Sequence, residues 1–414
     1  MRYKIEKKDN ALQGVITLPA SKSICNRALI MNALSPSPIQ IENISESDDS
    51  KVMLKALSLD SNTIDIGHAG TAMRFLTAFF SQKEGEWILT GSSRMKERPI
   101  AVLVEALKKM GAEISYTEKE GYPPLKIKGK NLQGGALSLD GSVSSQYISA
   151  ILMLAPTLKD GIELTLTNRV ISRSYIELTL EMMKHFGVES HFEENKITIT
   201  PQQYKATEFL CESDWTGASY IYQIAALCDN VDLTLPYLFK NSLQGDCAII
   251  NWFEKFGITT TETDKGLQIK KTGQFTEDKL ELDFILNPDV AQTMAVLCGI
   301  LKIPFHFSGL ETLKIKETDR IHALQVECAK MGMKLIEPIE GSLSWDGTFD
   351  QSLKQEPNIF DTYKDHRMAM SYCAVGMFNH PIYINEPMVV TKSYPRFWDD
   401  MKNAGFTIEE VKKN

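Results

Sequence analysis

The stretch LPASKSICNRALIMNAL, residues 18–34, sets a lysine and an arginine among small hydroxyl residues where an apolar helix is expected to begin. Ser21 or Ser23 can cap this helix. A helix N-terminus carries unpaired N–H groups and partial positive charge, so the added cations Lys22 and Arg27 favour an anion bound among them. The alternative is a solvated lysine and arginine at a helix start.

Three further stretches place bases at turns or helix starts. They are GSSRMKERPI with Arg94, Lys96 and Arg98, LKIKETDRIHAL with Lys314, Lys316, Glu317 and Arg320, and VVTKSYPRFWDDM with Lys392. Each alone also fits a solvated loop or a helix-surface ion pair. Together they supply enough donors for a substrate with two or three negative charges.

Carboxylates stand at three other expected helix starts, at Asp214, Asp289 and Asp365. The simplest interpretation of such an aspartate is an N-cap. If these helix starts share a cleft with the basic ones, one side binds anions and the other transfers protons.

The elements that must position these residues repeat six times. Each copy has a short strand, a turn of small polar residues and a helix rich in Ala, Met and Leu, and the copies start at Leu18, Ile64, Leu139, Cys211, Leu282 and Phe360. Four second helices are each predicted to end at a glycine and continue into a strand: Gly111, Gly187, Gly257 and Gly332. Six βαβ-hairpin units in 414 residues predict two domains of three units each.

The composition narrows the class of protein. A net charge of −8 argues against general affinity for nucleic acid or anionic membranes, so any anion site is a local cluster of bases. Seven dispersed cysteines, without a C-x-x-C pair, predict a reducing compartment. With no signal-peptide pattern and no spanning run of apolar residues, we expect a cytoplasmic protein. Metal-binding histidine spacings, a Walker loop and G-x-G-x-x-G at a helix start are all absent from the sequence, so no metal or nucleotide is expected.

As a set, these motifs resemble those of the 5-enolpyruvylshikimate-3-phosphate synthase family. The matching stretches are LPASKSICNR, GHAGTAMRF, RMKERPI, GSVSSQY, LNPDVAQTM, KIKETDR, YKDHRMAM and TKSYP, spread over residues 18–398. The resemblance implies an α/β fold, a two-domain inverse α/β barrel with three βαβαββ units per domain and an active site in the interdomain cleft. It also implies a domain of residues 1–19 plus 213–414 that holds the acid and base, and a domain of residues 20–212 that holds most phosphate-binding residues.

The resemblance further implies transfer of the enolpyruvyl group of phosphoenolpyruvate to the 5-hydroxyl of shikimate 3-phosphate, with release of phosphate and without a cofactor. On matching positions, the residues implied to bind shikimate 3-phosphate are Lys22, Ser23, Arg27, Ser144, Ser145, Gln146, Ser172, Asp289 and Lys316. Those implied to bind phosphoenolpyruvate are Lys22, Gly70, Arg98, Gln146, Arg320, Arg367 and Lys392. The partners are these two small molecules, and a monomer is expected.

Catalysis is implied for Asp289, Glu317, Lys22 and Lys392. Asp289 accepts the proton of the 5-hydroxyl, and Glu317 protonates the methylene carbon, with Lys392 as the competing donor. A helix start and nearby bases favour the ionised form of Glu317, whereas a donor must hold a proton.

Three residues depart from the family's pattern. His68 stands where Asn usually precedes Ala-Gly-Thr, Phe75 where Pro often follows Arg74, and Thr312 where an Asn precedes KETDR. We therefore expect an altered affinity for glyphosate, the family's inhibitor that overlaps the phosphoenolpyruvate site.

Two alternatives remain. A UDP-N-acetylglucosamine enolpyruvyl transferase shares the fold and the chemistry, but that family usually carries a reactive cysteine in the loop matching GSSRMKERP, and here no cysteine lies between Cys25 and Cys211. A catalytically silent phosphosugar-binding module is the other alternative.

Overall fold

The computed structural model describes residues 1–58, 61–170, 173–378 and 381–412. The chain folds into two compact units: unit 1 is Met1–Pro19 with Glu212–Asn414, and unit 2 is Ala20–Cys211. The predicted domains, 1–19 plus 213–414 and 20–212, lie within one residue of this division. The chemical roles assigned to them remain predictions.

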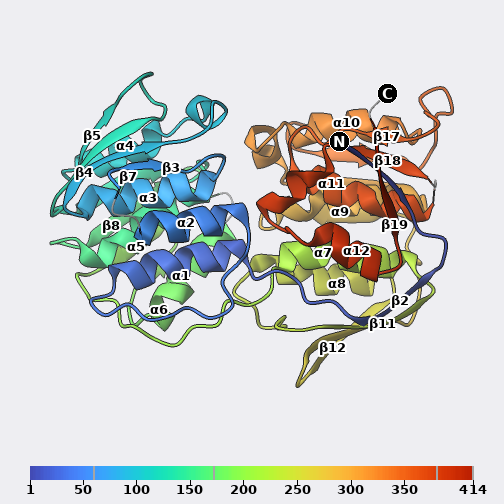
Figure 1. The fold of residues 1–414 in the computed structure, drawn as a ribbon, viewed down its shortest axis with the longest axis horizontal. Helices are drawn as coiled ribbons and strands as arrows, with labels where there is room; N and C mark the ends of the chain where they lie inside the picture. Colours follow the sequence, from blue (N-terminus) through green and yellow to red (C-terminus); the bar gives the residue numbers. More distant parts are fainter. Residues whose placement is uncertain (59–60, 171–172, 379–380, 413–414) are drawn as a thin grey trace. The chain divides into compact units, whose positions relative to one another are not determined.

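Unit 2 has three central helices and an outer layer of helices and strands (Figure 1). The central helices are α1 (Lys22–Leu34), α3 (Gly70–Gln82) and α5 (Ser145–Leu154), which pack on one another. The outer elements are α2 (Asp48–Ser58), β3 (Thr63–Asp65), β4 (Gly85–Thr90), η1 (Met95–Glu97), α4 (Ala101–Lys109), β5 (Glu113–Tyr116), β6 (Leu125–Gly129), β7 (Gly135–Asp140), η2 (Ala155–Thr157), β8 (Ile162–Thr167), α6 (Arg173–His185), β9 (His191–Glu193) and β10 (Lys196–Ile199).

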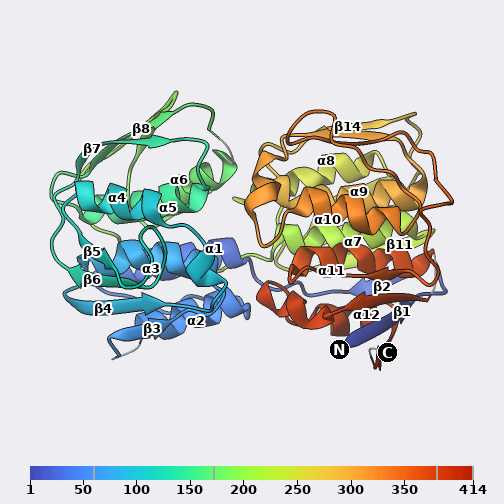
Figure 2. The same cartoon turned by 90° about the horizontal axis from the view of Figure 1, so that it is seen from above.

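Unit 1 repeats the plan with central helices α7 (Trp215–Leu227), α9 (Ala291–Leu301) and α11 (His366–Cys373). Around them lie β1 (Arg2–Glu6), β2 (Ala11–Val15), β11 (Asn230–Leu235), η3 (Gly245–Ala248), α8 (Ile249–Glu254), β12 (Ile258–Thr263), β13 (Gly266–Lys271), β14 (Leu280–Asp283), η4 (Pro288–Val290), β15 (Phe305–Ser308), η5 (Glu311–Ile315), α10 (Arg320–Ala329), β16 (Leu343–Trp345), β17 (Ile359–Phe360), η6 (Ala374–Met377), β18 (Ile382–Asn385), η7 (Pro387–Lys392), α12 (Phe397–Asn403) and β19 (Thr407–Val411). Figure 2 shows α7, α9 and α11 inside this unit, with strands outside them.

Five sheets form in the described part of the chain, and all start with the same pairing. The first strand is parallel to the second, and the second is antiparallel to the third, as in β3-β4-β6-β5, β7-β8-β10-β9, β2-β11-β13-β12, β14-β15-β16 and β17-β18-β1-β19. A parallel pair needs a crossover connection, usually a helix. Each central helix from α3 onward lies in the chain between the two strands of one parallel pair. This is the predicted α/β repeat. The copy at Leu18 differs, since residues 20–58 contribute two helices and an isolated bridge between Glu42 and Leu210.

Local signals explain where the helices start and end. Ser21 caps α1, since its Oγ accepts the N–H of Ile24 at 3.4 Å, and Ser144 and Asp365 cap α5 and α11. The four predicted C-terminal glycines all adopt positive φ, between 75° and 100°, which a side chain would disfavour: Gly111, Gly187, Gly257 and Gly332.

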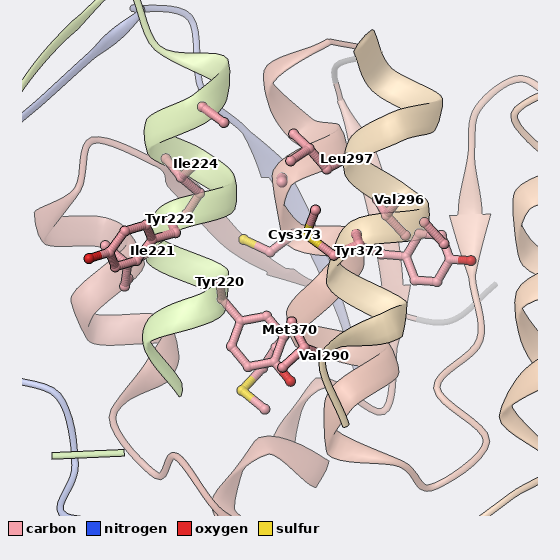
Figure 3. Packing of buried hydrophobic residues seen from close by; sticks show 14 of the residues in the cluster. Tyr220, Ile221, Tyr222, Ile224, Val290, Val296, Leu297, Met370, Tyr372 and Cys373 are labelled. Carbon is pink, nitrogen blue, oxygen red and sulfur yellow. The ribbon is translucent and has the colours of Figure 1, made fainter. Parts of the chain in front are cut away.

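The central helices are buried around their whole circumference because two layers of elements cover them. In α7, α9 and α11 the side chains of Tyr220, Leu297, Met370 and their neighbours fill the space between the helices (Figure 3). Such helices cannot rotate without opening cavities, at a cost of about 2–5 kcal/mol for each large side chain displaced. Their first turns therefore hold polar residues in fixed places.

Candidate active site

The centre of the polar cluster in unit 1 is Arg320, the first residue of α10. Its side chain is 1% exposed. Its Nε donates to Asp365 Oδ2 at 2.7 Å, Nη1 to Asp289 Oδ1 at 2.8 Å, and Nη2 to Glu317 Oε2 at 2.8 Å. Burial opposes its charge, but these carboxylates outweigh burial and raise the pKa of Arg320. One guanidinium thus joins three segments that the sequence separates by up to 76 residues, from Asp289 to Asp365.

Asp289 lies on the short turn η4 between two arginines. Its second oxygen, Oδ2, accepts from Arg367 Nη2 at 3.1 Å, and Lys316 Nζ lies 3.5 Å from Oδ1. Burial alone would raise the pKa of Asp289, but the charges of Arg367, Lys316 and Arg320 hold it well below its usual range. Asp289 is therefore ionised at neutral pH, with each oxygen directed at a different cation.

Glu317 bridges two cations in the same cluster. Besides Arg320, it contacts Lys392 Nζ, from the end of η7. The structure therefore brings together all six predicted site residues of unit 1: Asp289, Lys316, Glu317, Arg320, Arg367 and Lys392. A carboxylate and an ammonium lie beside one another here, so the geometry does not choose between Glu317 and Lys392 as the predicted proton donor.

Asp365 was expected only at a helix start, and its contact with Arg320 was not expected. It caps α11, accepting the N–H of Arg367 at 2.9 Å, and the same carboxylate binds Arg320. The capping interpretation is therefore confirmed for Asp365, and the same carboxylate also binds the guanidinium of Arg320. Its place directly before His366 and Arg367 at a helix start was the available signal.

In unit 2, the predicted residues gather at the starts of α3 and α5. Gly70 begins α3, and a Cβ there would lie 2.6 Å from Arg98 Nη1 and 2.7 Å from Arg74 Nη1. Gln146, in the first turn of α5, donates from Nε2 to Thr71 Oγ1 at 3.4 Å. Glycine at position 70 leaves room for these two guanidinium groups, and a side chain there would displace the ends of both arginines.

The loop GSSRMKERPI separates into surface and site residues. Arg94 pairs with Glu97 at 2.9 Å and Lys96 with Glu118 at 2.6 Å, and these pairs are largely exposed. Such pairs add little stability. Arg98, in contrast, lies against Gly70. The solvated-loop alternative thus holds for the first two bases, and Arg98 is the base placed with the predicted site.

The side chain of Arg27, in α1, points into the protein interior and is buried. Its guanidinium donates to Thr179 Oγ1 at 2.8 Å, Ser149 Oγ at 3.0 Å and the Ser23 carbonyl at 2.8 Å, and it lies over the ring of Phe75 at 5.4 Å. Burial lowers its pKa to about 10, so it stays charged at neutral pH. Lys22 and Ser23 begin α1, and Ser144 and Ser145 begin α5. Ser172 lies outside the described residues.

The three departures have visible environments. His68 is exposed, with Nδ1 3.0 Å from Ser92 Oγ. Phe75, which stands where the family often has a proline, is fully buried. Its ring makes a cation–π contact with the guanidinium of Arg27. The Thr312 hydroxyl is buried and has no hydrogen-bond partner among the described residues.

Comparison with known proteins now decides the family. Residues 6–60 and 58–401 match the profile described as EPSP synthase (3-phosphoshikimate 1-carboxyvinyltransferase). The chain belongs to the EPSP synthase family. A 3-phosphoshikimate 1-carboxyvinyltransferase of Bacteroides fragilis is 47% identical over 410 residues, 99% of each chain. One of Vibrio campbellii is 35% identical, covering 95% of this chain and 97% of its own.

Solved structures agree on the fold of this EPSP synthase family member. An EPSP synthase from Acinetobacter baumannii has a TM-score of 0.80 at 22% identity, covering 99% of this chain and all of its own. The enolpyruvyl transferase NikO from Streptomyces tendae has a TM-score of 0.73 at 12% identity, covering 100% and 99%. The predicted two-domain inverse α/β fold is confirmed. In the described residues, no helix is long and apolar enough to cross a membrane.

Proposed function

We propose that this chain transfers the enolpyruvyl group of phosphoenolpyruvate to the 5-hydroxyl of shikimate 3-phosphate, releasing phosphate. One observation carries the proposal: in a member of the EPSP synthase family, Arg320 ties Asp289, Glu317 and Asp365 into one buried cluster with Arg367 and Lys392 nearby. This arrangement offers both a base and two acids beside cations that attract an anionic substrate.

Shikimate 3-phosphate is proposed to bind to the helix starts of unit 2 and to part of the unit 1 cluster. Helix N-termini present free N–H groups, and serine hydroxyls at α1 and α5 add donors for a phosphate. Buried Arg27 adds positive charge and holds the Ser23 carbonyl. The proposed binding residues are Lys22, Ser23, Arg27, Ser144, Ser145, Gln146, Ser172, Asp289 and Lys316.

Phosphoenolpyruvate is proposed to bind to bases of both units. Arginines suit this substrate because their planar forks bind carboxylate and phosphate oxygens in pairs. Gly70 supports this role by leaving room for Arg98. The proposed binding residues are Lys22, Gly70, Arg98, Gln146, Arg320, Arg367 and Lys392.

Asp289 is proposed to take the proton of the 5-hydroxyl as that oxygen attacks. Its low pKa makes it a weak base in the free protein. When Arg367 and Arg320 turn part of their charge toward a bound anion, they stabilise the Asp289 carboxylate less, and its pKa rises toward the useful range. Substrate binding thereby activates the base.

The second proton is proposed to go to the methylene carbon, which creates an oxocarbenium-like centre for the attacking hydroxyl. Glu317 or Lys392 donates this proton, and the contact between them allows the other residue to reprotonate the donor. Departure of phosphate from the resulting ketal, with loss of a proton from its new methyl group back to the residue that donated it, restores the double bond and completes the transfer. Lys22 is proposed to stabilise the charge that develops on the phosphate.

The test is phosphate release from phosphoenolpyruvate, measured with and without shikimate 3-phosphate. We expect release only with both. Asp289→Asn should lower kcat about 10²- to 10⁴-fold, and Glu317→Gln should mainly lower kcat, whereas Lys22→Ala should weaken both substrates. Unchanged turnover with weaker binding in Glu317→Gln would contradict its assignment.

The same assay separates the alternatives. Binding of shikimate 3-phosphate without phosphate release at any pH would identify a silent module. Release that depends on UDP-N-acetylglucosamine instead would identify the other transferase, which the cysteine-free stretch between Cys25 and Cys211 argues against. A monomeric, cytoplasmic enzyme is part of the proposal, and light scattering tests the first of these.

A further inference from the structure

A second buried carboxylate, Asp246, lies behind the Asp289 turn and has no role in the reaction described above. It is on η3, 5% exposed. Its Oδ2 accepts from the hydroxyl of Thr216, in the first turn of α7, and its Oδ1 accepts from Asn287 Nδ2 at 3.2 Å. Both partners are also buried. Three polar side chains from three elements therefore form one closed interaction away from water.

Asn287 is two residues before Asp289 and begins the turn η4. This turn has only three residues, and a single 3₁₀ turn has weak internal hydrogen bonding. Val290, packed in the core, holds the far side of the turn (Figure 3). The hydrogen bond to Asp246 holds the near side. Asp289 is thus fixed between a hydrophobic anchor and a polar one.

The orientation matters because Asp289 uses both oxygens. Oδ1 faces Arg320 at 2.8 Å and Oδ2 faces Arg367 at 3.1 Å. A modest rotation of η4 would break one of these bonds, and displacements of about 1 Å at a catalytic group cost on the order of 100-fold in rate. The backbone of the turn contributes the bond from the Val290 N–H to the Asn287 carbonyl at 3.1 Å, and the side-chain bond to Asp246 adds a second hold on Asn287.

The loop carrying Asp246 is itself anchored to the start of α7. Gln244 Nε2 donates to the Ser213 carbonyl at 2.9 Å, and its Oε1 accepts the N–H of Trp215 at 3.2 Å. Burial raises the pKa of Asp246, and the negative charge of Asp289 raises it further. The hydrogen bonds from Thr216 and Asn287 and the charge of Arg367 only partly offset this rise. A costly buried carboxylate kept beside the predicted base indicates a functional demand.

We infer that Asp246 is a positioning residue for the transfer reaction, which holds Asn287, and through it Asp289, in the orientation shared by Arg320 and Arg367. This inference rests on the proposed function, because it assigns Asp246 to the same reaction. It adds a requirement that the motif around Asp289 does not contain: a residue 43 positions earlier in the chain.

The experiment is a double-mutant cycle on phosphate release. Asp246→Ala should lower kcat about 10- to 100-fold with KM values changed less than threefold. Asp246→Asn should restore kcat to within about threefold, because its amide can accept from Asn287 and donate to Thr216. Adding Asp246→Ala to Asp289→Asn should cost nothing further, since Asp246 acts through Asp289.

Additive losses in the cycle, or Asp246→Asn as slow as Asp246→Ala, would overturn the inference. If Asp246→Ala does not fold, Asn287→Ala replaces it in the same cycle, since it removes the other end of the bond. If the unsubstituted protein releases no phosphate, the proposed function fails instead. Coupling between Asp246→Ala and Asn287→Ala in melting temperature then decides whether the tie exists, and its absence overturns the inference.

Discussion

Unit 1 and unit 2 bury arginines in opposite ways. Arg320 in unit 1 is neutralised by three carboxylates, whereas Arg27 in unit 2 contacts hydroxyls, a carbonyl and an aromatic ring. In unit 1 the charge of Arg320 is balanced by its carboxylate partners. In unit 2 the guanidinium of Arg27 contacts neutral groups. The same repeated fold thus surrounds a buried arginine with either charged or neutral partners.

The largest expected effect tests this contrast directly. Arg320→Gln leaves three buried carboxylates without their common cation and should destabilise the protein by about 3–5 kcal/mol. Arg27→Gln leaves only neutral partners and should cost about 1–3 kcal/mol. Calorimetric unfolding of both variants measures the difference, and an equal or larger loss for Arg27→Gln would contradict the comparison.

A buried carboxyl that lacks such cations should have a raised pKa, whereas the pKa of Asp289 is lowered. Glu212 is 8% exposed, and burial raises its pKa from 4.5 to about 7, although hydrogen bonds such as that from Ser242 oppose the rise. Between these two pH values the folded protein holds a proton that the unfolded chain has released, so stability falls as pH rises. A rise from 4.5 to about 7 corresponds to at most about 3 kcal/mol.

Glu212→Gln should therefore be more stable than the unsubstituted protein at pH 8, with the advantage lost near pH 4. Melting temperatures measured across this range provide the test. The exposed Glu262→Gln is the matched control and should follow the unsubstituted protein at every pH. Parallel pH curves for all three proteins would show that Glu212 is not strained by burial.

A smaller effect compares two glycines in the first turns of central helices. Gly70→Ala forces Arg98 and Arg74 to move, and should raise KM for phosphoenolpyruvate about tenfold, equivalent to about 1.4 kcal/mol. Gly217→Ala, in α7 of unit 1, meets nothing nearer than 3.6 Å and should leave KM within about twofold. Steady-state kinetics on both variants decide the point, and equal changes would remove the special role of position 70.

The smallest effect concerns glyphosate. His68→Asn restores the residue usual in the family, in a loop beside the start of α3, and should change the inhibition constant about threefold or more through one altered hydrogen bond. Inhibition curves at fixed phosphoenolpyruvate concentration measure it. A curve for the unsubstituted protein that matches a standard sensitive enzyme would refute the expected difference.

Much of the fold follows from local sequence signals. Serine and aspartate caps, apolar runs and terminal glycines act over a few residues, so the starts of the central helices were predictable. The cluster around Arg320 followed from motif resemblance rather than spacing, because its members are distant in the chain. Asp246 and the buried partners of Arg27 were not predictable, since nothing local distinguishes a buried aspartate in a loop from a solvated one.

The strands β1 and β2 lie at the start of the chain but belong to unit 1, as the blue strands among yellow and red ones show (Figure 1). β2 pairs with β11, and β1 lies between β18 and β19. During synthesis, β2 leaves the ribosome about 220 residues before β11, and β1 about 380 residues before β18. The strands of the contiguous unit 2 pair only with one another in the described residues. Unit 2 can therefore fold first, and unit 1 must wait with two bare strand edges exposed to other chains. The path of the backbone between the two units thus sets the order in which they can fold. Truncating the first 15 residues should impair the folding of unit 1 and leave the folding of unit 2 unchanged.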